Sequence, residues 1–214
     1  MMGGVRSGLL GTEAPALGGG ADSDDILGGG DPPGTLGINE AEPMSTAKIG
    51  YVKSDWDKDS PEFTDPFVIS GATIDQVWNV LKGMSEWGEG GGHLELEFPN
   101  DFASSQSVVL KAHLVRRLVQ WKEYDKARGV EKEAWNKMFR KLMEHEDRHV
   151  EIAVEEAEKL AASLIGQTKA QGKAATKTAN SQMLARQHKL DTETRHGEKE
   201  GVKYGDVILD LSKT

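Results

Sequence analysis

The chain has 214 residues and a formal net charge of −9, with 37% hydrophobic and 29% charged residues. This length suits one domain with extensions better than two domains. The acidic balance disfavours a dedicated nucleic-acid binder and a protein that binds anionic membrane surfaces, because both partners attract clustered positive charge.

The sequence contains no cysteine, which excludes disulfides, thiol nucleophiles and thiolate metal sites. Any metal must therefore be held by histidine, aspartate or glutamate. No run approaches the roughly 18 apolar residues of a membrane span. The start, MMGGVRSGLLGTEAPALGGG, lacks the apolar core of a secretory signal peptide. The compartment stays undetermined between the cytoplasm and export by a non-classical route, such as a phage particle or an injection system.

Residues 1–45 form a separate zone of composition, rich in glycine and proline. Such a segment cannot bury enough apolar area to offset its chain entropy, so we expect a disordered, flexible arm. The arm is a candidate contact for an assembly partner. Met44 opens MSTAKIGYV and would serve as a start, in which case residues 1–43 are an extension or a start-site error. Residues 46–214 are expected to fold as a single domain.

The first half of that domain shows strand patterns around one short helix. AKIGYVK and PFVISG predict short strands, and Thr73 is a suitable N-cap for a helix over IDQVWNVLKGM. The run EWGEGGG is expected to break this helix. HLELEF and SVVLKAHLVRRLVQW then alternate in polarity, which predicts strands of an antiparallel sheet. A helix over residues 106–119 remains an alternative.

The second half predicts two helices. From about residue 131 to 165, apolar residues and two histidines recur on one stripe, and Gly166 is well placed to end the helix. A second, more polar helix is expected over 168–190, anchored by Met183 and Leu184, and the tail DVILDL reads as a closing strand. Strands followed by helices indicate an α+β fold.

The long helix contains the sequence His-Glu-Asp-Arg-His at 145–149. His145 and His149 are four residues apart, so on a helix both rings project from one face and can reach one Zn²⁺. Glu146 can contact a metal-activated water as general base, which is the H-E-x-x-H arrangement of zinc peptidases. The alternative is that a long charged helix has placed these residues by chance. Against that, two histidines on an inward stripe need partners, and a shared metal satisfies both.

A catalytic zinc needs a third protein ligand. Ile152 and Glu155 stand where a metzincin has glycine and its third histidine, so that subclass is excluded. His196, in a polar turn before Gly197, is a candidate ligand, with a solvated loop as the alternative. The other histidines are expected on the surface or in packing: His93, His113 and His188.

Four features resemble the bacterial domain-of-unknown-function family 922, whose members are usually described as predicted secreted zinc-dependent proteases. They are FVISGATIDQVWNVL, LVQWKEYDKA, EAWNKMFRKLMEHEDRHVEIAVEEA, and an Asp191-x-x-Thr194-x-His196-Gly197 sequence followed by Gly201. The resemblance covers roughly residues 48–205.

The resemblance implies that His196 is the third zinc ligand. It also implies that Asp191 and Thr194 support a ligand or set the turn, whereas on the residues alone they could simply cap the helix end. The family usually has tyrosine where this chain has Leu190, and Tyr204 is a candidate substitute for it. The signal peptide and the cysteines that are frequent in the family are absent here.

The leading hypothesis is therefore a zinc metallopeptidase of α+β, zincin-like build that acts on a peptide or protein substrate. In it His145, His149 and His196 bind Zn²⁺, and Glu146 is the general base. The alternative is a non-catalytic structural or interaction module of a larger assembly, held together by a structural metal.

Overall fold

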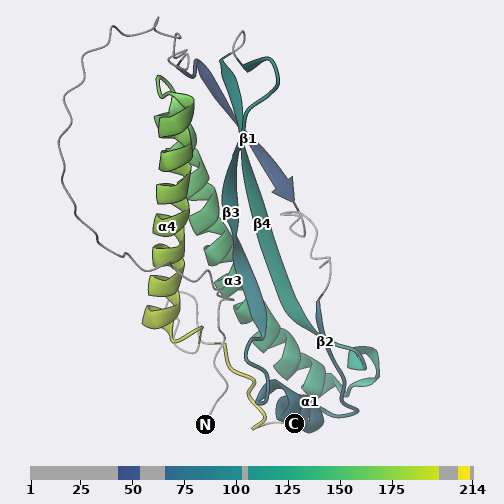
Figure 1. The fold of residues 1–214 in the computed structure, drawn as a ribbon. Coiled ribbons are helices and arrows are strands. Elements are labelled where there is room, and N and C mark those ends of the chain that lie inside the picture. Colours follow the sequence, from purple (N-terminus) through teal and green to yellow (C-terminus); the bar gives the residue numbers. More distant parts are fainter. Residues whose placement is uncertain (1–42, 54–65, 103–105, 198–206, 213–214) are drawn as a thin grey trace, which may run out of the picture.

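A computed structural model describes residues 43–53, 66–102, 106–197 and 207–212. The fold is α+β, as predicted, with a sheet on one side and two long helices on the other (Figure 1). The elements in chain order are β1 Thr46–Lys53, β2 Phe67–Ile69, α1 Ile74–Leu81, β3 Gly88–Glu97, β4 Ser107–Trp121, a 3-10 turn Tyr124–Lys126, α3 Gly129–Leu164 and α4 Lys169–Thr194.

The sheet is built around β4, which pairs with the other three strands. β3 runs antiparallel to β4, whereas β1 and β2 run parallel to it. The prediction of an antiparallel sheet is therefore wrong for two of the three pairings. Alternation of polar and apolar residues reports which face of a strand is buried, but it carries no information on strand direction.

β4 has one face buried in the core of the domain. Val108, Leu110, Ala112 and Leu114 are at most 1% exposed, while the residues between them are partly exposed. This period of two rules out the alternative of a helix over 106–119. α3 packs against β3 and β4, and α4 packs against α3 and β3.

The long helix and its neighbour match the predicted ranges, with α4 extending four residues further, to Thr194. Gly166 follows α3 with a φ of 80°, as expected of a residue that ends a helix. Met183 is buried, but Leu184 is 47% exposed, so its predicted role as an anchor is wrong. Among the described residues, no helix combines the length and apolar character that crossing a membrane requires.

Carboxylate hydrogen bonds join the start of α1 to the start of α3. Thr73 caps α1 as predicted, its side chain accepting from the backbone N–H of Gln76. The buried carboxylate of Glu131 accepts from the backbone N–H groups of Ile74 and Arg128. The hydrogen bonds from Arg128 and Ile74 lower the pKa of Glu131 to about 2.

Both ends of the predicted domain differ from expectation. Residues 1–42 of the predicted arm lie outside the described residues, but Met44, which the arm was expected to include, is 1% exposed in the core. Val207 and Leu209 are buried beside α1, yet no strand is assigned to residues 207–212, so the closing strand is wrong.

α1 ends at Leu81, ahead of the glycine run, and the run itself forms the first part of β3, so this strand begins earlier than the predicted HLELEF. β3 begins at Gly88 and crosses α3 at the His-Glu-Asp-Arg-His sequence. A Cβ added to Gly90 would lie 2.3 Å from the carbonyl oxygen of Glu146. Only glycine allows the backbones of β3 and α3 to approach this closely.

Replacing Gly90 with alanine should therefore destabilise the protein by about 1–3 kcal/mol, since the methyl group meets backbone that cannot move without shifting α3. The matched control is Gly129→Ala, at a helix start with nothing within 4 Å of the added Cβ. Urea denaturation of both variants measures the difference. Equal stabilities for the two variants would contradict the close approach.

Candidate functional site

The two motif histidines lie side by side under the sheet. His145 and His149 project from α3 one turn apart, and both are 0% exposed. Their Nε2 atoms are 3.2 Å apart, with the rings nearly perpendicular at 83°. α3 thus directs two imidazole nitrogens to one buried point, as the sequence predicts.

Asp191, in the last turn of α4, brings a carboxylate to the same point. Its Oδ1 lies 2.9 Å from Nε2 of His149 and 3.5 Å from Nε2 of His145, and its side chain is 3% exposed. Among the described residues these three form a group that could hold a metal ion, with ligand atoms all within 4.8 Å of one another.

The spacing of these atoms fits a tetrahedral ion. Ligands about 2.0–2.1 Å from a tetrahedrally coordinated zinc lie about 3.3 Å from each other. The three observed separations, 2.9, 3.2 and 3.5 Å, fall on both sides of that value. The donor set of two imidazoles and one carboxylate also suits zinc.

Asp147 and Arg148, the two residues between Glu146 and His149, make polar contacts with the sheet and with His145. The carboxylate of Asp147 accepts a 2.6 Å hydrogen bond from the buried Arg116 of β4, which ties α3 to the sheet. Nη2 of Arg148 lies 3.3 Å from Nδ1 of His145. Because a guanidinium only donates, this contact favours the ring proton on Nε2. Coordination through Nε2 of His145 would move that proton to Nδ1, so Arg148 would have to turn aside.

Glu146 is buried next to the histidines, at 1% exposure. Its carboxyl packs against Gly88, where an added Cβ would lie 2.6 Å from Oε1. No described residue hydrogen-bonds to Oε1. Burial raises the pKa of Glu146 to about 8, opposed by the charge of His145 and reinforced by that of Asp191. In the metal-free chain, Glu146 is therefore a buried, protonated acid at neutral pH.

The Asp-x-x-Thr-x-His-Gly sequence forms the end of α4. The hydroxyl of Thr194 donates to the carbonyl of Leu190 and accepts from the N–H of Gly197, so Thr194 sets the turn. Arg195, His196 and Gly197 all have left-handed φ values, between 51° and 84°. Three such residues in succession fold the chain sharply after the helix.

His196 lies at the edge of the metal group. Its Nδ1 is 3.7 Å from Oδ1 of Asp191, its side chain is 33% exposed, and it is not a member of the group. The structure thus brings His196 close to the predicted site, and its assignment as third ligand stays a prediction. Tyr204, the candidate substitute for the family's tyrosine, lies outside the described residues.

The remaining histidines are away from this group, as expected. His188 is exposed on α4, and His93 stacks on His113 across β3 and β4 with ring centroids 4.3 Å apart. Sequence reasoning missed the contribution of Gly88 and Gly90, which hold β3 against Glu146. The signal was the glycine run itself, directly ahead of the strand HLELEF.

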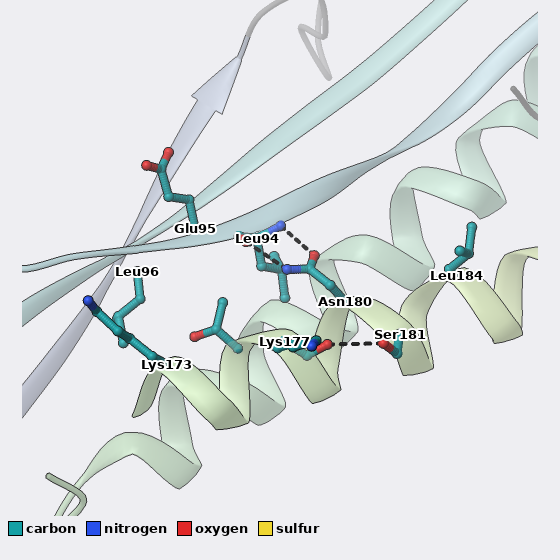
Figure 2. A pocket seen from close by; sticks show the side chains of 9 residues that line it. Leu94, Glu95, Leu96, Lys173, Lys177, Asn180, Ser181 and Leu184 are labelled. Carbon is teal, nitrogen blue, oxygen red and sulfur yellow. Dashed lines mark hydrogen bonds between the residues drawn. The ribbon is translucent and has the colours of Figure 1, made fainter. Parts of the chain in front are cut away.

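A surface groove lies between β3 and α4, apart from the metal group (Figure 2). Asn180 of α4 spans it, since its side chain bonds both the N–H and the carbonyl of Leu94. A second hollow lies beside Trp121 and Trp135. Neither is lined by a residue of the metal group, so within the described residues these hollows do not open onto it.

The raised pKa of Glu146 predicts a pH-dependent stability in metal-free protein. The folded state keeps Glu146 protonated up to a pKa of about 8, whereas the unfolded chain loses that proton near 4.5. This contribution is complete at low pH and is lost as the pH rises from 4.5 toward 8. Glu146→Gln should therefore be more stable than wild type at pH 8, by more than about 1 kcal/mol.

Urea denaturation at pH 5, 6.5 and 8 with a chelator present measures this gain, which should grow with pH. Glu151→Gln, at an exposed position of the same helix, is the control and should show no such trend. A gain that is the same at all three pH values would contradict the burial of the carboxyl as its cause.

The comparison with protein families gives one match. The family model described as "Bacterial protein of unknown function (DUF922)" matches residues 65–197, a range that contains the metal group, Glu146 and the turn after α4. No curated protein and no solved structure matches the chain. Because the match covers more than half of the sequence and includes both motifs, the chain belongs to the DUF922 family of bacterial proteins.

Proposed function

We propose that this protein is a zinc-dependent hydrolase that cleaves peptide bonds, with Glu146 as general base. The observation that carries the proposal is the pairing of a buried metal-ligand group with a buried acid. His145, His149 and Asp191 place three ligand atoms at tetrahedral spacing. Glu146 lies close enough for the charges of His145 and Asp191 to affect its pKa.

A bound zinc ion would supply a Lewis acid that lowers the pKa of water and polarises a carbonyl group. Glu146 would accept a proton from water as the water oxygen bonds to the carbonyl carbon and the carbonyl π electrons move to its oxygen. The same carboxyl would then deliver the proton to the leaving nitrogen as the C–N bond breaks. The form of Glu146 that accepts the proton is the ionised carboxylate, and a divalent cation beside it would favour that form over the protonated acid of the metal-free chain.

A second candidate is a non-catalytic module in which the metal stabilises the packing of α3 and α4. The burial of the group favours this candidate, since His145 and His149 are 0% exposed and Asp191 is 2% exposed. A structural metal has no need of Glu146, however. A buried acid whose Oε1 has no hydrogen-bond partner within the described residues lowers stability, which argues for a chemical use.

The test compares Glu146→Gln with wild type after zinc reconstitution. We expect about one zinc per chain in both proteins, and hydrolysis of a fluorogenic peptide library by the wild type only. The variant should lose at least 100-fold in kcat, because general-base catalysis contributes about 10²–10⁴-fold. Elemental analysis and fluorescence measure the two quantities.

Glu151→Gln carries the same change at an exposed position of α3 and should retain both zinc and activity. Zinc bound by all three proteins without any peptide hydrolysis would favour the structural module. Full hydrolysis by Glu146→Gln would show that another group is the base.

A further inference from the structure

We propose that Asp191 is the third protein ligand of the metal, and that His196 instead contacts the substrate at the open side of the site. This inference rests on the proposed function, and it reverses the roles that the sequence predicts for these two residues. It concerns the position of each side chain relative to the two helix histidines.

The distances favour Asp191. Its Oδ1 lies 2.9 and 3.5 Å from the two histidine Nε2 atoms, close to the spacing of about 3.3 Å for tetrahedral zinc ligands. The carboxylate therefore needs almost no movement to share an ion with His145 and His149. His196 is described in the same structure, but it falls outside the group of mutually close ligand atoms.

Charge favours Asp191 as well. Three neutral imidazoles would supply no negative charge directly to a divalent ion in a site where His145 and His149 are 0% exposed. Burying an uncompensated charge costs several kcal/mol. A carboxylate ligand offsets one of the ion's two charges directly, which a histidine cannot do.

The local structure holds Asp191 more firmly than His196. Asp191 is within α4, whose position is fixed by Arg186, which pairs with Glu155 and Glu156 of α3. His196 comes after the end of α4, in the left-handed turn, where its backbone N–H donates to the carbonyl of Asp191. Metal ligands need rigid supporting elements if their geometry is to be kept within a fraction of an ångström.

The position of His196 suits contact with a substrate. Its side chain is 33% exposed, whereas the three members of the metal group are at most 3% exposed in their side chains. The imidazole therefore borders solvent on one side and Asp191, 3.7 Å away, on the other. From there an N–H of His196 would donate to the carbonyl oxygen of a peptide and stabilise the negative charge that gathers on that oxygen.

The experiment measures zinc affinity in the full chain by competition with a chromophoric chelator. Asp191→Asn keeps the size of the side chain and removes its charge. We expect a loss of zinc affinity as large as that in His145→Ala and larger than the roughly 10–100-fold loss that follows when a residue that only supports a ligand is changed. His196→Asn should bind zinc within about 5-fold of wild type. It should lower kcat for a cleaved peptide about 10²–10³-fold, with a smaller change in KM. Glu193→Gln, an exposed acid between the two residues, is the matched control and should bind as wild type does.

Cobalt substitution gives a second measurement that does not depend on how Asp191→Asn folds. The visible absorption of bound Co²⁺ should be the same in wild type and in His196→Asn if His196 is not a ligand. A changed spectrum, or zinc loss in His196→Asn equal to that in His145→Ala, would overturn the assignment while leaving a zinc hydrolase in place. Zinc loss in Glu193→Gln would overturn it too. A wild type that binds no zinc would refute the proposed function itself.

Discussion

The close approach of β3 to α3 is the constraint on which the rest of the site depends. Gly90 lets the strand pass against the carbonyl of Glu146, and Gly88 leaves room for the carboxyl of the same residue. This contact excludes water from Glu146 and so raises its pKa. The chemistry of the acid thus depends in part on backbone packing at two positions without side chains.

The same contact places the metal group between the two halves of the core. Leu142 belongs to the cluster around α1, whereas Val150 belongs to the cluster under α4. The histidines lie between these two residues on α3, so apolar packing fixes the helix on both sides of them. Buried polar groups in such a place need partners. Asp191 meets this need for His149 in the structure, and a shared cation would meet it for all three residues.

Local periodicity was enough to predict the helix that carries the histidines and the central strand of the sheet. The stripe on α3 indicated that His145 and His149 face inward, and alternation indicated the strand β4 with its buried face. The direction of β1 and β2 could not be predicted, because strand direction depends on how the chain crosses between distant segments. The residues alone did not place Asp191 beside the histidines, since its position depends on the packing of α4 on α3; only the family resemblance implied that it supports a ligand or sets the turn. Because glycine has a low strand propensity, the run EWGEGGG was not expected to form part of a strand. The packing of β3 against α3 overrode that propensity.

Burial of the metal group and the presence of Glu146 point to different uses of one site. A structural metal gains from complete burial, which slows its loss, and every ligand candidate except His196 meets that condition. Glu146 indicates a catalytic site instead. A glutamine has the same shape and would avoid the free-energy cost of burying an ionisable acid, so a structural site gains nothing from Glu146. Residues that lower stability in this way are retained where they perform chemistry. On this interpretation, a substrate would reach the site from the exposed side of His196. This side lies next to the hydrogen bond from the N–H of Val207 to the carbonyl of Gly197.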